Sequence, residues 1–149
     1  MHVTDRFSIA GHDDDAGTCT LALDGQPIAS RFDGREMEAQ YVCGNDRFLL
    51  CTSMGTGWDD VFTLYLLDHA GRTLDAIAGG GLMSSGVFRA IACRDDVLDF
   101  TCFSDRVLRL SITPSPQLRA LLPAPWRYRN LLSRHYLALR ELPPGASHD

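Results

Sequence analysis

Apolar and polar residues alternate along most of the chain with a period of two. The alternation is clear at Cys19, Leu21 and Leu23, which are separated by polar or small residues. A period of two places alternate side chains on opposite faces of a strand, whereas a helix requires a period of about 3.6. We therefore predict a mainly β fold: an antiparallel sandwich or a barrel-like meander of about nine short strands, with a short helical segment near the C-terminus.

Turn residues separate the predicted strands. The Asp-Gly pair at 24–25 and the Gly-Asn-Asp sequence at 44–46 favour the positive φ angles of tight hairpins. Residues 61–67 are apolar on both faces, which is typical of a central strand covered on both sides. Together with the Asp-x-x-Gly turn and the strand after it, this stretch also resembles one hairpin of a β-propeller blade. A propeller of about three or four blades is therefore an alternative fold.

Three glycines at 79–81, with Ser84 after them, approximate the fingerprint of a dinucleotide-binding loop. That fingerprint functions only where a helix follows directly, so that the helix N-terminus faces the phosphates. Residues 87–91 alternate as a strand instead. We interpret residues 79–86 as a flexible turn that links two strands.

The pattern changes near the C-terminus. Pro114 and Pro116 should end the strand region, because proline cannot donate to a β-ladder. Residues 117–122 then fit a short helix, and Pro125 suits the first turn of another. Six residues share one helical face at the spacing i, i+3, i+4, i+7, i+8 and i+11: Tyr128, Leu131, Leu132, His135, Tyr136 and Leu139. A closing strand over 135–142 is the alternative.

The length of 149 residues is typical of one domain, and it allows enough burial to fold without disulfides or a structural metal. We predict a single β-rich domain over residues 1–142, which includes an arginine-rich segment at 115–142, and a disordered tail at 143–149. No apolar run approaches the roughly 20 residues of a membrane-spanning helix, and residues 1–6 lead into no signal-peptide core. A cytoplasmic location is expected.

The charged residues are distributed unevenly. All fourteen basic residues are arginines, and the nineteen acidic residues give a net charge of −5. Residues 1–114 hold nine arginines and seventeen acidic residues, whereas residues 115–149 hold five arginines and two acidic residues. An acidic body repels the phosphate backbone, so we expect no direct nucleic-acid binding. The absence of lysine excludes a P-loop and Schiff-base chemistry, and it suggests a GC-rich bacterial genome.

Cysteine and histidine form none of the local patterns of a metal or catalytic site. The five cysteines include no Cys-x-x-Cys pair, and each lies in an apolar run: Cys19, Cys43, Cys51, Cys93 and Cys102. This is typical of buried free thiols in a reducing compartment. The five histidines are isolated, without the His-Glu-x-x-His spacing of zinc enzymes. We expect no cofactor, no metal and no catalytic residue.

Acidic residues concentrate in four of the predicted connections between strands. The connection at 55–60 places Trp58 beside glycines and two aspartates, which favours a rim position for the indole. Tryptophan is enriched at binding hot spots, and carboxylates suit a basic partner. The alternative is that Trp58 folds back over the sheet and that the aspartates are solvated. The candidate partner-binding residues are Trp58, Asp59, Asp60, Asp13, Asp14, Asp15, Glu36, Glu38, Asp95 and Asp96.

A metal site at 12–15 is the other interpretation of the aspartate triplet. Three adjacent aspartates in an extended segment point in opposing directions, whereas calcium requires carboxylates that converge from alternating positions of a loop. We therefore interpret the triplet as a solvated acidic turn or a surface that faces a partner.

A small, acidic, β-rich chain with acidic loops at 13–15, 59–60 and 95–96 resembles bacterial immunity proteins, such as those of contact-dependent growth inhibition systems. The resemblance implies a non-catalytic protein that binds the toxin domain of its own cell's system in a 1:1 complex and occludes its active site. Many such toxins are nucleases with basic clefts, so the expected partner is a basic domain, reached with the help of electrostatic steering.

Two other functions remain open. Aromatic residues of the predicted strands would suit a small-molecule-binding β-barrel, with or without enzymatic activity: Phe62, Tyr65, Phe88, Phe100 and Phe103. The sequence Trp-Arg-Tyr-Arg at 126–129 interleaves aromatic residues with arginines, as single-strand nucleic-acid binders do. Within an acidic molecule these arginines are better suited to pairing with the body of the protein or to self-association.

Overall fold

The computed structural model describes residues 1–56, 58–130 and 134–146. These residues form strands β1 (His2–Val3), β2 (Phe7–Asp13), β3 (Thr18–Leu23), β4 (Gln26–Asp33), β5 (Glu36–Cys43), β6 (Arg47–Ser53), β7 (Val61–Leu67), β8 (Thr73–Gly80), β9 (Arg89–Arg94), β10 (Val97–Thr101), β11 (Leu108–Leu118), β12 (Arg127–Tyr128) and β13 (Arg134–Glu141). The described chain therefore has thirteen strands, more than the nine or so predicted, because short and partly polar strands such as β1, β2 and β12 lack a strong alternation.

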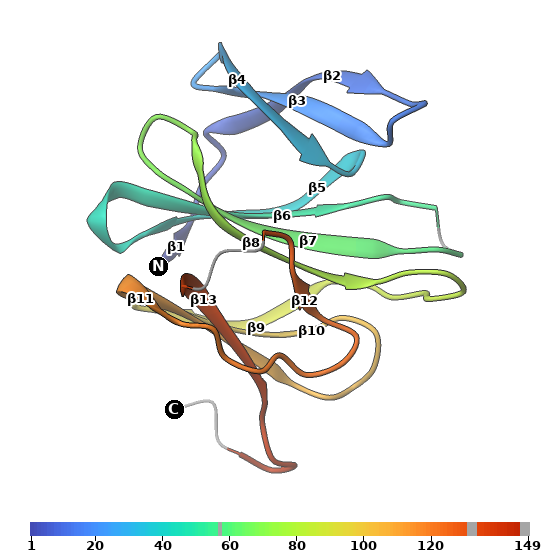
Figure 1. The fold of residues 1–149 in the computed structure, drawn as a ribbon, viewed down its shortest axis with the longest axis vertical. Coiled ribbons are helices and arrows are strands. Elements are labelled where there is room, and N and C mark those ends of the chain that lie inside the picture. The colour runs from blue at the N-terminus through green and yellow to red at the C-terminus, as the bar shows by residue number, and fades with distance from the viewer. Residues whose placement is uncertain (57, 131–133, 147–149) are drawn as a thin grey trace.

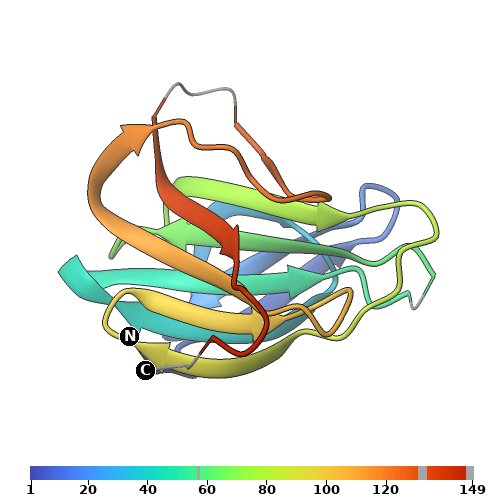
Figure 2. The same cartoon turned by 90° about the horizontal axis from the view of Figure 1, so that it is seen from below.

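Three antiparallel sheets are stacked in layers (Figure 1). The middle sheet has six strands in the order β1-β5-β6-β7-β8-β12. A three-stranded sheet, β2-β3-β4, covers one of its faces, and a four-stranded sheet, β13-β11-β10-β9, covers the other (Figure 2). The described strands close no barrel, and the sheets stack instead of radiating as propeller blades do. The predicted antiparallel sandwich is confirmed, in a three-layer form.

Strand β7 explains why two layers cover the middle sheet. Leu64 and Leu66 point into the core shared with the four-stranded sheet, whereas Tyr65 and Leu67 point into the core shared with the three-stranded sheet. All four side chains are buried. Burying one such side chain contributes about 1.5–3 kcal/mol, so a strand that is apolar on both faces is most stable between two layers. The prediction for residues 61–67 is confirmed.

Aromatic side chains fill both cores. The ring centroids of Phe32 and Tyr65 lie 5.1 Å apart in an edge-to-face contact beneath the three-stranded sheet. On the other side of the middle sheet, Phe100 lies 5.8 Å from Trp126, also edge to face. Such pairs contribute about 0.5–1.5 kcal/mol beyond the area they bury. Tyr65 and Phe100, which could have lined a ligand cavity, are therefore used in packing.

The two strongest turn signals form turns, as predicted. Asp24 and Gly25 have φ angles of 51° and 80° between β3 and β4, and Asn45 has a φ angle of 61° between β5 and β6. Glycine, asparagine and aspartate tolerate this left-handed region better than other residues. Arg6 also pairs with Asp24 at 2.5 Å, so an ion pair to a residue outside the turn stabilises the β3–β4 turn as well.

The glycines at 79–81 lie partly inside a strand. Gly79 and Gly80 belong to β8, so the prediction of a turn over 79–86 is wrong for its first two residues. A Cβ at Gly79 would lie 2.6 Å from the indole of Trp126. Glycine at this position therefore lets the indole pack directly on the strand backbone.

Strand β11 continues through both prolines. It spans Leu108–Leu118, so the predicted end of the strand region at Pro114 and the predicted helix over 117–122 are wrong. The pairing with β13 is interrupted between Ile112 and Gln117. The prolines lie inside this interruption, where the ladder needs no backbone donor.

The C-terminal arginine-rich segment ends in a strand. Strand β13 pairs with β11, which confirms the alternative of a closing strand and overturns the helical face that included His135 and Leu139. Leu131 and Leu132, which the helix prediction also included, lie outside the described residues. Pro125 lies in a turn, and the described chain contains no helix apart from a three-residue 3₁₀ turn at Gly44–Asp46.

The chain beyond β13 turns away from the sheet. The Ala146 N–H donates to the carbonyl of Pro143 at 3.1 Å, while residues 147–149 of the predicted tail lie outside the described residues. No helix in the described ranges is long and apolar enough to span a membrane.

Candidate functional site

Three large apolar side chains project from one end of the molecule. Trp58, on the β6–β7 loop, is 81% exposed, and Leu82 and Met83, on the β8–β9 loop, are 86% and 87% exposed. They border one hollow of about 470 Å³ together with Asp59 and Ser85. We call Trp58, Leu82 and Met83 the apolar tip. Figure 1 shows the two loops side by side at the end of the middle sheet.

Hydrogen bonds hold the two loops of the apolar tip together. The Asp59 carboxylate accepts the backbone N–H of Met83 at 2.6 Å. Beside it, the Asp60 N–H donates to the carbonyl of Ser84 at 2.8 Å, and the Asp60 carboxylate accepts the N–H of Gly86 at 3.3 Å. Each loop thus fixes the backbone of the other, so the apolar tip is preorganised.

Asp60 and Asp59 have different surroundings although they are adjacent. Asp60 is only 5% exposed, and its carboxylate is directed to the backbone of its own chain. A Cβ at Gly80 would lie 2.1 Å from the Asp60 carbonyl, and Gly80 has a φ angle of 101°. Glycine is therefore needed for the close approach of these two segments. Of the two candidate residues, Asp59 is the one available to a partner.

The aspartate triplet lies at the same end as the apolar tip. Asp13 pairs with Arg31 at 3.1 Å, and Asp14 pairs with Arg35 at 3.3 Å. The backbone N–H of Ala16 and the Arg31 guanidinium hold the pKa of Asp13 below its usual value. The turn that follows touches the β6–β7 loop, since a Cβ at Gly17 would lie 3.0 Å from the Met54 methyl group.

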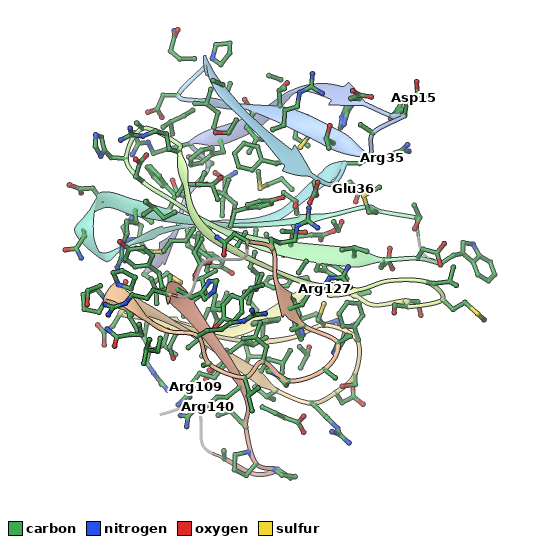
Figure 3. All side chains as sticks on the ribbon, viewed as in Figure 1. Asp15, Arg35, Glu36, Arg109, Arg127 and Arg140 are labelled. Carbon is green, nitrogen blue, oxygen red and sulfur yellow. The ribbon has the colours of Figure 1, made fainter. Side chains whose placement is uncertain are left out.

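Glu36 connects the triplet to the apolar tip. It begins β5, and a Cβ on Gly55 would lie 2.7 Å from its carboxyl carbon, so Glu36 lies directly against the β6–β7 loop. Figure 3 shows Asp15 and Glu36 on the side of the molecule from which these loops project. Glu38 is two residues further along β5 and accepts the hydroxyl proton of Ser53. Glu38 is exposed too, but it is hydrogen-bonded to Ser53, so we use the name acidic rim for the other four exposed carboxylates: Asp14, Asp15, Glu36 and Asp59.

Asp95 and Asp96 lie at the opposite end of the molecule. The Asp96 carboxylate accepts the N–H of Gly44 at 2.8 Å and lies 3.6 Å from the Arg47 guanidinium. Gly44 follows the last residue of β5, whereas Glu36 is its first, so the length of that strand separates Asp96 from the acidic rim. The carbonyl of Asp95 accepts the N-terminal amino group of Met1. The structure therefore does not bring this pair together with the other candidate residues.

Leu82 and Met83 are not among the candidate residues predicted from the sequence. The available signal was two consecutive large apolar residues inside a stretch of glycine and serine, where a turn has no core to bury them. A buried polar cluster was not predicted either. His135 Nδ1 lies 2.9 Å from a carboxylate oxygen of Asp75, and the ring of Tyr128 stacks on the imidazole at 3.6 Å.

The Asp75 carboxylate links two sheets. It accepts the backbone N–H groups of Tyr136 at 2.8 Å and Leu137 at 3.0 Å, as well as that of Ala76 at 2.9 Å. These donors belong to β13 of the four-stranded sheet and to β8 of the middle sheet. The cluster of Asp75 and His135 thus fixes the position of β13 on the core, and both side chains are buried.

The cysteines are free thiols, and four of the five are buried. Burial raises the pKa of Cys43 to about 12 and raises the pKa of Cys51 well above its usual value. Such thiols stay protonated and unreactive near neutral pH. Within the described ranges, no group of three or more histidine, cysteine and acidic side chains could hold a metal ion.

The aromatic residues of the arginine-rich segment point inward. Trp126 and Tyr128 are 5% and 8% exposed, so neither ring can stack on a nucleic-acid base without leaving the core. The guanidinium of Arg129 pairs with Asp33 at the end of β4. At least this arginine pairs with the acidic body of the protein.

Comparisons with protein-family models, with curated proteins and with solved structures found no match. The molecule is a three-layer antiparallel stack with an apolar tip and an acidic rim at one end.

Proposed function

We propose that this chain is a non-catalytic binding protein that neutralises a cognate bacterial toxin domain in the cytoplasm, as an immunity protein does, by covering the active site of that domain. The observation that carries the proposal is the apolar tip, whose three side chains are 81–87% exposed on two loops. Water-exposed apolar side chains rarely gather at one place of a soluble protein unless a partner covers them. A tryptophan among them is the residue type most suited to a binding hot spot.

The acidic rim indicates the chemistry of the partner. Four exposed carboxylates lie on the loops and strand ends around the apolar tip, and Arg35 offsets only part of their charge. A complementary partner has a basic surface around an apolar hollow, and the active-site cleft of a nuclease is basic because it binds phosphates. Attraction between the two would speed association, and insertion of the apolar tip would hold the complex.

The hydrogen bonds behind the apolar tip support a role in tight binding. The Asp59–Met83 and Asp60–Ser84 bonds fix both loops in the free protein, so fewer degrees of freedom are lost on association. Asp60 serves as a positioning residue in this proposal, whereas Trp58 and Asp59 contact the partner. Asp95 and Asp96 would remain outside a contact centred on the apolar tip.

Co-expression with candidate toxin domains tests the proposal. We expect recovery of a 1:1 complex and loss of the toxin activity in its presence. A triple variant with Trp58→Ser, Leu82→Ser and Met83→Ser should lose both, because the substitutions are on the surface and leave both cores intact. Val3→Ser is the matched control, since Val3 is 74% exposed and lies on β1, away from the apolar tip. Full protection by the triple variant would contradict the proposal.

A further inference from the structure

The chain contains a long segment with arginines and no carboxylates. Residues 106–140 include seven arginines and neither aspartate nor glutamate. Three of these arginines pair with carboxylates from outside the segment: Arg106 with Glu141 at 3.1 Å, Arg109 with Asp99 at 2.7 Å, and Arg129 with Asp33. The last pair joins an exposed arginine to the partly exposed end of β4, whereas Asp99 is buried under Arg109.

Other arginines of the segment surround an exposed leucine. Leu121 lies on the connection between β11 and β12 and is 98% exposed. A hollow of about 130 Å³ separates Leu121 from the side chains of Arg119, Arg127 and Tyr128. The Arg119 guanidinium lies over the Tyr128 ring at 5.5 Å, which leaves its edge free to donate hydrogen bonds. Arg127 is exposed and makes no ion pair within the described residues. We call Arg119, Leu121 and Arg127 the basic patch.

The apolar tip and the basic patch have complementary chemistry. One presents large apolar side chains beside carboxylates, and the other presents an apolar side chain and a hollow beside guanidinium groups. Arginine and carboxylate form charge-assisted, often bidentate, hydrogen bonds, and a methionine side chain packs well against the leucine and tyrosine that line part of the hollow.

The two surfaces cannot meet within one molecule. The loops of the apolar tip project from one end of the stack, whereas the connection to β12 runs along a different edge (Figure 2). In Figure 3, Arg127 lies below Asp15 and Glu36, on β12 at the edge of the middle sheet. The basic patch requires a partner with apolar side chains beside carboxylates. The apolar tip and acidic rim of another copy of this chain provide both.

We propose that copies of this chain associate head to tail, with the apolar tip of one copy seated on the basic patch of the next. The contact is heterologous: it uses a different surface on each copy, so every dimer keeps one free apolar tip and one free basic patch. Each copy has a net charge of −5, so repulsion opposes the contact at long range, and the local Arg–carboxylate pairs favour it at short range. The association covers the surface that the proposed function assigns to the toxin, and the toxin domain would displace the second copy.

Sedimentation velocity of the full chain, from about 1 µM to about 1 mM, tests the association, because weak protein contacts fall within this range. We expect the weight-average mass to rise above that of one chain as the concentration rises. The tip variant, Trp58→Ser with Met83→Ser, and the patch variant, Leu121→Ser with Arg127→Glu, should each remain single chains. Val3→Ser combined with Arg140→Glu is the matched control, which changes an exposed apolar residue and an exposed arginine elsewhere and should associate as the original chain does.

An equimolar mixture of the tip variant and the patch variant is the decisive measurement. The tip variant retains its basic patch and the patch variant retains its apolar tip, so the mixture should form pairs of chains and nothing larger. A mixture that contains only single chains would indicate a two-fold symmetric contact and overturn the proposal, as would an original chain that is monomeric at every concentration. The patch variant should still neutralise the toxin, so failure of the association and failure of the proposed function give different results.

Discussion

Trp58 is the side chain from which we expect the largest contribution to the affinity for the toxin domain. Its indole is 81% exposed and lies between the carboxylates of the acidic rim and two further apolar residues. We expect Trp58→Ala to weaken the complex with the toxin domain by at least about 30-fold, because truncation of a tryptophan hot spot costs roughly 2 kcal/mol or more. Isothermal titration calorimetry with the purified toxin domain measures the change. Val3→Ala should leave the affinity unchanged, and equal losses in both variants would argue against a contact centred on the apolar tip.

The residues of the apolar tip differ in how far the sequence reveals them. The rim position of Trp58 is favoured by the sequence, because glycines precede it and two aspartates follow it, although a fold back over the sheet is the alternative. Leu82 and Met83 are not predictable, because their place beside Trp58 depends on the pairing of β7 with β8. The burial of Asp60 is equally invisible in the sequence, since it follows from the approach of Gly80 to within contact of its carbonyl. A surface property that depends on a single residue type can be inferred from the sequence. A property that depends on the contact between the β6–β7 and β8–β9 loops cannot.

Asp75 shows the cost of removing one buried acceptor. Asp75→Ala would leave the N–H groups of Tyr136 and Leu137 and the imidazole of His135 without their acceptor inside the core. Each unsatisfied buried group costs about 1–3 kcal/mol, so we expect the free energy of unfolding to fall by roughly 3 kcal/mol or more. Urea denaturation measures it. Asp105→Ala, at an exposed position, is the control and should change stability by less than about 0.5 kcal/mol.

At the scale of elements, strand β7 is the part of the fold on which both cores depend. Leu64 belongs to one core and Leu67 to the other, and both have no exposed surface. We expect Leu64→Ala and Leu67→Ala each to lower the free energy of unfolding by about 2–5 kcal/mol, the usual range for a leucine deleted from a packed core. Val61→Ala, at the half-buried start of the strand, should cost less. If either leucine variant were close to neutral in urea denaturation, β7 would be covered on one face only.

Elements set by neighbouring residues are predictable from the sequence, and elements set by distant ones are not. The turns at Asp24 and Asn45 depend on their own φ angles, and β7 is specified by its continuous apolar run. By contrast, β11 continues through Pro114 because its pairing with β13 is interrupted there, which is a property of the partner strand. The segment of β13 fits a helical and a strand pattern equally well, and the contacts of Asp75 decide between them.

At the scale of the whole molecule, the charge distribution sets how the complex responds to salt. The acidic rim would attract a basic partner over several ångströms, and mobile ions screen exposed charges over about 10 Å at 0.1 M salt. We expect the dissociation constant to rise by roughly tenfold or more between about 50 and 500 mM salt, mainly through slower association. Surface plasmon resonance over this range measures both rates. An affinity that does not change with salt would exclude a role for the acidic rim in steering.

Alkaline pH should destabilise the whole molecule. Burial raises the pKa of Cys43 and the pKa of Tyr41 to about 12 each, from the usual values of about 8.5 for a thiol and about 10 for a phenol. Between those usual values and pH 12 the unfolded chain loses these protons while the folded chain keeps them, so the free energy of unfolding should fall as the pH rises from about 9. Urea denaturation at pH 7, 9 and 10.5 measures the slope. Cys43→Ala should reduce it, and an unchanged stability over this range would contradict the burial of these groups.

Because the chain is synthesised from its N-terminus, the layers of the stack become available to pack at different times. The outer three-stranded sheet spans residues 7–33, and the strands against which it packs end at residue 80. Phe7, Leu21 and Phe32 therefore emerge from the ribosome well before β6, β7 and β8, whose side chains bury them. Until β5–β8 are synthesised, nothing covers the apolar face of the three-stranded sheet, so the nascent chain passes through a stage with an exposed aromatic surface. Chaperones that bind exposed apolar segments would meet the protein at this stage, before β8 has been translated.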